Sequence, residues 1–230
     1  MKTIGLIGGM SWESTSPSYR IINEKIKENL GGLHSARIIL YSVEFAEIEA
    51  CQASGQWDKS AEILADAAVK LEAAGADFIV ICTNTMHKVA SQIQAKISIP
   101  IIHIADATAD RLETAGIRKV ALLGTKYTMT QDFYKSRLID RGFEVLIPDE
   151  AGVETVNSVI YQELCLGIIR EESRSAFSRI IESLKARGAE AVILGCTEIG
   201  LLVRQDCSAL PIFDTTEIHA LCAAELALQS

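Results

Sequence analysis

The feature that most constrains the fold of this chain is an internal repeat. The segment LEAAGADFIVICT, which ends at Cys82-Thr83, resembles LKARGAEAVILGCT, which ends at Cys196-Thr197. Each copy contains a helix end, a glycine, an apolar run and a Cys-Thr pair. Two further pairs of segments recur in the same order, IGLIG (4–8) with VALLG (120–124) and IPII (99–102) with LPIF (210–213). Three matches in register predict two related halves.

Short apolar runs alternate with amphipathic stretches along the whole chain. The runs are continuous and rich in β-branched residues, as expected of parallel strands that are covered on both faces. The predicted strands are residues 3–8, 37–43, 77–82, 100–103, 119–123, 143–147, 191–195 and 211–213. Residues 57–74 and 177–187 show helical periodicity, and we expect these helices to stop at Gly75 and Gly188. The sequence therefore predicts an α/β protein with two pseudo-symmetric lobes, each a parallel sheet flanked by helices.

The repeat also sets the predicted domain organisation. A chain of 230 residues is long enough to form two small domains with cores of their own. We expect an N-terminal lobe of residues 1–102 plus 214–230 and a C-terminal lobe of residues 103–213. No linker-like segment separates the halves, so the expected boundary is an ordinary loop near residue 103.

Charge and hydropathy narrow the possible function classes. The formal net charge is −8 without a basic run, which disfavours binding to nucleic-acid phosphates. No apolar stretch reaches the roughly 18 residues that a membrane span needs. The first four residues lead directly into a predicted strand, so we expect no signal peptide. These observations predict a cytoplasmic protein that binds neither nucleic acid nor a membrane.

The spacing of the six cysteines argues against a metal or redox motif. No two of them form a CxxC pair, so neither a zinc cluster nor a thioredoxin-type pair is expected. A single buried cysteine is more often a small apolar core residue than a catalyst. That interpretation is kept for Cys51, Cys165, Cys207 and Cys222. The repetition of Cys-Thr instead favours a chemical role for Cys82 and Cys196.

Both Cys-Thr pairs stand at the C-terminal end of a predicted buried strand, where ligands of open α/β sheets bind. Two halves related by a pseudo-two-fold axis would present the cysteines to one shared cleft. Inverting a stereocentre by proton transfer needs a base on one face of the carbon and an acid on the other. A thiolate and a thiol meet this need, since a free thiol has a pKa of about 8.5. The pattern therefore predicts proton transfer by Cys82 and Cys196.

The residues after the cysteines suit a carboxylate ligand. Thr83, Asn84 and Thr85 lead into a predicted helix start, where N–H groups and hydroxyls form an anion site. Thr197 follows Cys196 in the same way.

Glycine turns follow the first predicted strand of each half. Gly8-Gly9 in one half and Gly124, before Thr125, in the other are expected to let the backbone approach a ligand closely. A nucleotide-binding loop is the alternative interpretation of the first turn. The turn matches neither GxGxxG nor a P-loop, so it is weak evidence for a nucleotide.

At these motifs the chain resembles the aspartate/glutamate racemase superfamily, over essentially its whole length. The matching segments are GGMSWEST (8–15), CTNTMH (82–87) and GCTE (195–198). The resemblance is closest to the aspartate-racemase branch and its broad-specificity relatives. It implies two pseudo-symmetric α/β domains with catalysis between them, no pyridoxal phosphate, and a homodimer.

The resemblance also implies roles for individual residues. Cys82 and Cys196 would be the acid/base pair of an amino-acid racemase. The residues that would hold the amino-acid backbone are Thr83, Asn84, Thr85 and Thr197, with Met10, Gln52 and Glu198 lining the pocket and Thr125 as a further substrate-binding residue. No lysine lies in either cysteine motif and no cluster has metal-ligand spacing, so no cofactor or metal is expected.

One departure from the family pattern bears on the substrate. Members that select acidic amino acids hold the distal carboxylate with a cationic group. The region where such a group is expected, residues 45–52, contains no Lys or Arg, and neither does the segment 161–165. A buried carboxylate without a cation is costly. We therefore expect a neutral or small polar substrate side chain, such as that of homoserine, near Gln52.

Several alternatives remain open at this point. The chain could be a binding protein without chemistry, although such a protein would not need matched cysteines. It could also be a decarboxylase or a maleate isomerase-type enzyme on the same scaffold. His87 either orients Cys82 or lies on the surface, and His219 is a capping or packing residue. Glu198 either adjusts Cys196, holds the substrate ammonium group, or only favours a helix start.

Overall fold

The structure, a computed structural model, describes residues 1–229. The chain divides into two compact units. Unit 1 consists of Met1–Ile104 and the segment from His219 on, and unit 2 consists of Ala105–Ile218. The helices α5 (Ile104–Thr114) and α11 (Thr215–Leu228) carry the chain from one unit to the other.

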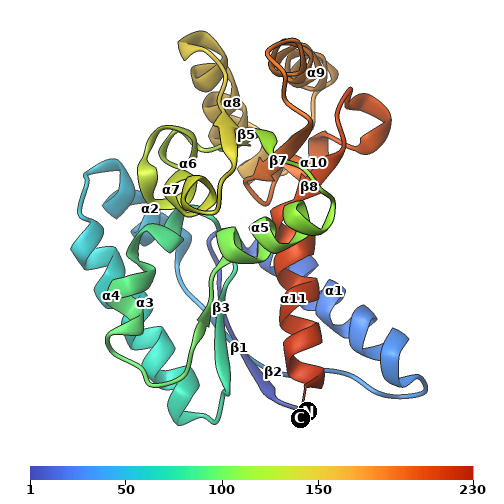
Figure 1. Ribbon diagram of the computed structural model, residues 1–230. Coiled ribbons are helices and arrows are strands. Elements are labelled where there is room, and N and C mark those ends of the chain that lie inside the picture. Colours follow the sequence, from blue (N-terminus) through green and yellow to red (C-terminus); the bar gives the residue numbers. More distant parts are fainter. Residues whose placement is uncertain (230) are drawn as a thin grey trace. The chain divides into compact units, whose positions relative to one another are not determined.

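Unit 1 is built on a parallel sheet with the strand order β2-β1-β3-β4 (Figure 1). Its strands are β1 (Thr3–Gly8), β2 (Arg37–Ser42), β3 (Phe78–Ile81) and β4 (Ile101–Ile102). Its helices are α1 (Trp12–Leu30), α2 (Phe45–Ala53), α3 (Trp57–Ala73) and α4 (Ala90–Gln94), with a 3₁₀ helix η1 (Thr85–Val89) and most of α11.

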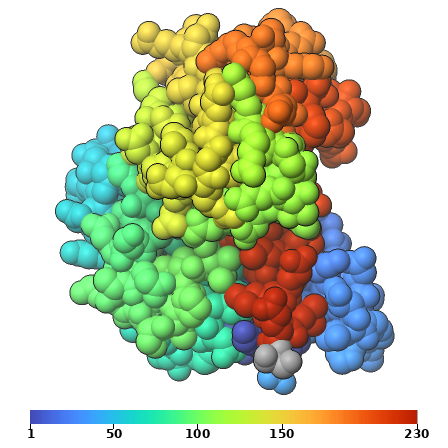
Figure 2. Space-filling model, viewed as in Figure 1, coloured from blue at the N-terminus to red at the C-terminus, as the bar shows by residue number. Residues whose placement is uncertain are grey.

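The two faces of this sheet pack against different helices, because successive strand residues point to opposite faces. Ile7, Ile79 and Ile81 pack against α3 and α4. Ile4 and Leu6 face the other way and pack against apolar residues of α1 and α11. Side chains of α11 (red) reach the surface of this unit beside those of α1 (blue) in Figure 2.

Unit 2 repeats the arrangement, with the strand order β6-β5-β7-β8. Its strands are β5 (Lys119–Gly124), β6 (Glu144–Leu146), β7 (Ala191–Gly195) and β8 (Ile212–Asp214). Its helices, besides most of α5, are α6 (Lys126–Thr130), α7 (Asp132–Asp140), α8 (Glu150–Gln162), α9 (Glu171–Ala186) and α10 (Ile199–Leu202), with 3₁₀ helices η2 (Leu164–Leu166) and η3 (Gln205–Cys207).

One face of the second sheet packs against α8, α9 and α10, through residues such as Leu123, Val192 and Leu194. Away from that core, α5 and α7 are joined by polar contacts. Arg137 of α7 pairs with Asp106 of α5 at 2.7 Å, and Arg141 bonds Asp110 and Glu113.

The architecture confirms the fold class that the sequence predicts, two four-stranded parallel sheets flanked by helices within residues 1–229. Each of the eight predicted strands is present, with ends that differ by at most one residue. The prediction that all of them are buried is wrong for β2, β4, β6 and β8. These four strands lie at the sheet edges and are partly exposed, since each has only one neighbouring strand.

The two repeated glycines end their helices as predicted. Gly75 and Gly188 adopt φ angles of +95° and +94°. The N–H of Gly75 donates to Glu72 O and that of Ala76 to Leu71 O, the pair of bonds that defines a Schellman motif. The predicted start of the second helix, at residue 177, is wrong, because α9 begins six residues earlier, at Glu171.

No helix within residues 1–229 combines the length and the hydropathy of a membrane span.

Candidate active site

Cys82 follows the last residue of β3, in the centre of the unit 1 sheet. Its N–H donates to Ile7 O at 2.9 Å, and the Ser14 hydroxyl donates to Cys82 O at 3.3 Å. Ile7 pairs with Ile81 in the β1–β3 register. The glycine turn after β1 and the Cys-Thr pair after β3 therefore lie at the same end of the sheet, beyond the C-terminal ends of the two strands.

The Cys82 thiol is buried among apolar side chains that include Val80 and Ala220. Burial raises the pKa of Cys82 to about 12, and a hydrogen bond from the Ser18 hydroxyl opposes this shift. Sequence reasoning missed Ser18. Its signal was present, since Ser14 and Ser18 continue at four-residue spacing the buried stripe of Ile22 and Ile26 on α1.

The glycine turn after β1 packs closely against a neighbouring segment of unit 1. Gly9 has a φ of +90°, and its N–H donates to the Thr15 hydroxyl at 2.9 Å. A Cβ at Gly9 would meet Ser42 Oγ at 2.7 Å and Val43 N at 2.8 Å. The close approach is therefore to the loop after β2, and the expectation that these glycines make room for a ligand has no support here.

The predicted binding residues of unit 1 are all buried. Thr83, Asn84 and Thr85 are between 2% and 9% exposed, and they lead into η1. The predicted helix start is thus a 3₁₀ helix of five residues. Met10 packs in the core between the sheet and α3, while Gln52 of α2 donates to the sulfur of Met86 at 3.0 Å.

Three histidine rings contact one another close to the segment that follows Cys82. The ring centroid of His87 lies 4.6 Å from that of His103 and 5.6 Å from that of His219. His87 Nε2 accepts a hydrogen bond from the Ile104 N–H, so Nδ1 carries the proton and donates to Thr83 O at 2.8 Å. His87 therefore holds the backbone next to Cys82, and its interpretation as a surface residue is wrong.

The other two histidines are also buried, each less than 9% exposed. His219 Nε2 donates to Ile102 O at 2.7 Å and so packs α11 against β4. Burial lowers the pKa of His219 to about 4. Burial, followed by the fields of His103 and His219, holds the pKa of His87 well below its usual value. Both shifts favour neutral His87 and His219 rings at neutral pH.

Cys196 occupies the corresponding position in unit 2. It follows β7, whose last residue Gly195 pairs with Gly124 at the end of β5. A Cβ at Gly124 would lie 2.8 Å from Gly195 O, so the two strand ends approach closely. Thr125, directly after β5, is the N-cap of α6, and its hydroxyl accepts from the Thr128 N–H at 3.3 Å.

The Cys196 thiol has a carboxylate as its immediate partner. Its Sγ–H donates to Glu198 Oε2 at 2.9 Å, and the Thr197 hydroxyl donates to the same oxygen at 2.7 Å. Glu198 is only 3% exposed. Burial raises the pKa of Cys196 well above its usual value, and the charges of Glu198 and Cys165 raise it further.

The predicted residues are divided between the two units. Unit 1 contains Met10, Gln52, Cys82, Thr83, Asn84 and Thr85, and unit 2 contains Thr125, Cys196, Thr197 and Glu198. Within unit 1 the Cys82 thiol packs on the α1 and α11 face of the sheet, whereas Met10 and the Gln52–Met86 contact belong to the opposite face. Each group contains one buried thiol with hydroxyl-bearing neighbours, which is a set able to move a proton beside a carboxylate. Among residues 1–229, no cluster of three or more His, Cys, Asp or Glu side chains is arranged to hold a metal ion.

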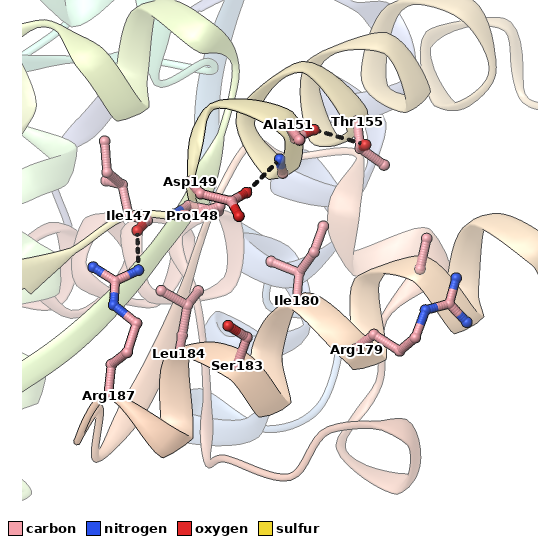
Figure 3. A pocket seen from close by; sticks show the side chains of 12 residues that line it. Ile147, Pro148, Asp149, Ala151, Thr155, Arg179, Ile180, Ser183, Leu184 and Arg187 are labelled. Atoms are coloured by element: carbon pink, nitrogen blue, oxygen red, sulfur yellow. Dashed lines mark hydrogen bonds between the residues drawn. The ribbon is translucent and has the colours of Figure 1, made fainter.

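A surface groove of about 650 Å³ lies elsewhere in unit 2, between α8 and α9 (Figure 3). Arg179 of α9 and Arg187, the C-cap of this helix, border it, and Arg187 Nη1 donates to Ile147 O at 2.8 Å. Asp149, the N-cap of α8, lies across from them. The predicted site residues of unit 2 do not line this groove.

Most of the chain matches a known protein family. The family model for Asp/Glu/Hydantoin racemases matches residues 7–223. The chain belongs to the Asp/Glu/Hydantoin racemase family. The match runs from β1 into α11 and therefore includes both cysteine motifs.

Individual members of this family are similar along their whole length. The chain is 26% identical to the broad specificity amino-acid racemase RacX of Bacillus subtilis, covering 93% of this chain and 92% of RacX. A candidate Asp/Glu racemase from Yersinia pestis, of known crystal structure, is 57% identical with a TM-score of 0.93 and full coverage of both chains. An aspartate racemase homologue from Pyrococcus horikoshii is 38% identical with a TM-score of 0.85, covering 99% of each chain.

Proposed function

We propose that this chain is a cofactor-independent amino-acid racemase in which Cys82 and Cys196 are the two acid/base groups. The observation that carries the proposal is the repeated placement of a buried cysteine, followed by a threonine, directly after the third strand of each sheet, in a chain of the racemase family. A two-base reaction needs two groups of one kind that exchange roles, and a thiol/thiolate pair provides them.

In the proposed reaction one cysteine, as the thiolate, removes the proton from Cα of one enantiomer. The electron pair of the broken C–H bond passes into the substrate carboxylate. The other cysteine, as the thiol, delivers its proton to the opposite face and becomes the thiolate. The raised pKa values of both thiols favour one ionised cysteine at a time, since burial opposes two charges.

The flanking residues have binding roles in this proposal. The hydroxyls and N–H groups of Thr83, Asn84 and Thr85 in unit 1, and of Thr197 in unit 2, hold the amino-acid backbone. Met10, Gln52, Thr125 and Glu198 complete the pocket. The chain thereby provides one acid/base group and one set of hydrogen-bond donors from each unit.

The test is racemisation and solvent-deuterium exchange at Cα, followed by NMR and chiral chromatography on a panel of amino acids. We expect Cys82→Ser and Cys196→Ser each to abolish racemisation in both directions, because a serine hydroxyl is too weak an acid to supply the base. Each variant keeps one thiol and should exchange deuterium into one enantiomer without inverting it, the two variants preferring opposite enantiomers. Cys222→Ser, on α11, is the matched control and should racemise as the unaltered chain does.

Full racemase activity in either cysteine variant would rule out the two-base assignment. Exchange into both enantiomers by one variant would indicate a single mobile base. Release of carbon dioxide without racemisation would instead favour a decarboxylase. Isomerisation of maleate would favour a maleate isomerase-type enzyme.

We further propose that the enzyme acts as a cytoplasmic homodimer without pyridoxal phosphate, nicotinamide or metal, as its family resemblance implies. Light scattering coupled to gel filtration measures the dimer. Dialysis against EDTA and treatment with hydroxylamine should leave racemisation unchanged, and loss of activity in either experiment would contradict the cofactor assignment.

A further inference from the structure

The contact between Cys196 and Glu198 requires a chemical explanation. The thiol hydrogen points at a carboxylate oxygen 2.9 Å away, and both side chains are at least 93% buried. A thiolate beside an ionised carboxylate would place two negative charges at this distance, which opposes formation of the thiolate. A carboxylate that only repelled the charge would hinder the base that the proposed function needs.

The same contact becomes useful when the carboxylate takes the proton. We propose that Glu198 is the immediate proton acceptor of Cys196, and that the two side chains share a single negative charge until the Cα proton is taken. This inference rests on the proposed function. Glu198 acts through Cys196, and is in this sense a positioning residue for the proton.

The proton balance is simple. When Cys196 serves as the base, its S–H bond breaks and an O–H bond forms on Glu198, so the charge moves from oxygen to sulfur. The thiolate then takes the Cα proton, and Cys82 gives its own proton to the opposite face. In the reverse direction Cys82, as the thiolate, removes the Cα proton. Cys196 gives up its thiol proton and then recovers one from Glu198.

The surroundings of the pair support this exchange. The Thr197 hydroxyl donates to the same Glu198 oxygen at 2.7 Å and fixes its direction toward the thiol. Cys165 is the other ionisable group that acts on Cys196, and it also disfavours the thiolate. Burial of both side chains likewise disfavours a second negative charge, so the pair favours one shared proton.

Cys82 has a different kind of partner. A hydrogen bond with the Ser18 hydroxyl, which also donates to Ser14 O at 3.2 Å, lowers the pKa of Cys82 and so stabilises a thiolate without removing the proton. The two units therefore support their thiols by different means, a proton acceptor for Cys196 and a hydrogen-bond donor for Cys82. The internal repeat therefore does not include the polar partners of the two thiols.

The experiment isolates Cys196 in the Cys82→Ser variant and measures deuterium exchange into L- and D-homoserine and L- and D-aspartate between pH 6.5 and 9. Glu198→Gln keeps the shape and a hydrogen bond but cannot take a proton. At pH 7 we expect it to slow the exchange by about 10²-fold, the usual effect of losing a positioned proton acceptor. The control variant Glu182→Gln removes an exposed charge on α9 and should leave the rate unchanged.

The direction of the change decides between the explanations. A carboxylate that only repels the thiolate predicts faster exchange in Glu198→Gln, since the thiolate becomes easier to form. Unchanged or faster exchange therefore overturns the proposal for Glu198 and leaves the two-cysteine function standing. Absence of exchange in the Cys82→Ser parent with every amino acid overturns the two-cysteine function, and the proposal for Glu198 falls with it.

A second measurement does not depend on the folding of the Glu198 variant. In the Cys82→Ser parent the proton passes to Glu198 within the protein, so the exchange rate should change little between pH 7 and 9. A thiol that loses its proton to solvent would give a rate that rises about tenfold per pH unit. Such a slope in the parent overturns the proposal, and partial recovery in Glu198→Asp supports it.

Discussion

At the scale of single residues, the polar groups buried next to the cysteines control their ionisation. A hydrogen bond with Ser18 lowers the pKa of the Cys82 thiol, while burial acts in the opposite direction. Without the Ser18 hydroxyl, burial alone would act on the pKa of Cys82, and this pKa would rise. The reactivity of Cys82 should therefore depend on a hydroxyl that lies 64 positions away in the chain and makes no contribution to the cysteine motif itself.

We expect Ser18→Ala to raise the pKa of Cys82 further. In the Cys196→Ser variant, where Cys82 acts alone, deuterium exchange at pH 7 should fall by about tenfold, the effect of one lost hydrogen bond of about 1.4 kcal/mol to a charged group. The pH at which exchange is half-maximal should move upward. Ser16→Ala, on the exposed face of α1, is the control. An unchanged pH profile would show that Ser18 does not stabilise the thiolate.

The histidine cluster leads to a prediction about stability in acid. Burial lowers the pKa of His219 from about 6.5 to about 4, so the unfolded chain binds this proton more readily than the folded one. The contribution to folding is complete above pH 6.5 and is lost as the pH falls from 6.5 toward 4. A shift of about 2.5 units corresponds to about 3 kcal/mol.

Urea unfolding at pH 7.5 and pH 5 measures this effect. The unaltered chain should lose stability toward pH 5, and His219→Gln should lose about 2 kcal/mol less over the same interval, since it has no proton to bind. The side chain of Gln can still donate to Ile102 O, so the variant should fold at pH 7.5. Equal losses in both proteins would contradict a neutral buried His219.

At the scale of elements, the repeated helix end gives a prediction about backbone conformation. Gly75 has a φ of +95°, and a Cβ there would meet no heavy atom within 4 Å. The cost of Gly75→Ala therefore comes from the left-handed backbone alone, and we expect about 1 kcal/mol of lost stability. Gly75→Asn should cost less, because Asn tolerates this conformation. Equal stability of all three proteins in thermal unfolding would contradict the assignment.

The strands and the repeat could be predicted from the sequence because they depend on local patterns. A continuous apolar run identifies a strand wherever both sheet faces are covered, and this holds for β1, β3, β5 and β7. The same pattern does not reveal which strand lies at an edge, since the strand order depends on contacts between distant segments. The partial exposure of β2, β4, β6 and β8 was therefore missed.

The residues of the candidate site, too, could be predicted only where they follow a local sequence pattern. The cysteines could be found because they recur in a repeat, and each lies directly after the predicted strand. Their polar partners are unequal in the two halves, so comparison of the halves does not find Ser18. The buried state of His87 depends on Ile104 and on α11, which join it only after the chain has folded. The roles of the site residues remain predictions until the variants are measured.

At the scale of the whole molecule, the two units share one plan, a parallel sheet in which the third strand ends in a cysteine. The predicted domain boundaries, at 102/103 and 213/214, stay predictions. The units of the structure meet in the sequence at 104/105 and 218/219, inside α5 and after the first turn of α11. Both boundaries of the units therefore fall within helices of the chain.

The charge of the whole molecule bears on the choice of substrate. The chain has 30 acidic and 22 basic residues, and its potential disfavours a ligand with net negative charge. Locally, α2 carries Glu47 and Glu49 and no Lys or Arg, with Gln52 buried near its end. A zwitterion such as homoserine carries no net charge, whereas aspartate brings one further carboxylate that needs a cation.

We therefore expect kcat/KM for homoserine or methionine to be at least equal to that for aspartate or glutamate. The comparison uses racemisation of all four amino acids at the same pH, at 0.05 M and at 0.5 M salt. Salt screens the field of the molecule, so the acidic substrates should gain relative to the neutral ones at the higher concentration. A tenfold preference for aspartate or glutamate over every neutral amino acid at both salt concentrations would require a cation at the distal pocket. Residues 45–52 and 161–165 do not supply one, so that cation would have to come from another part of the chain.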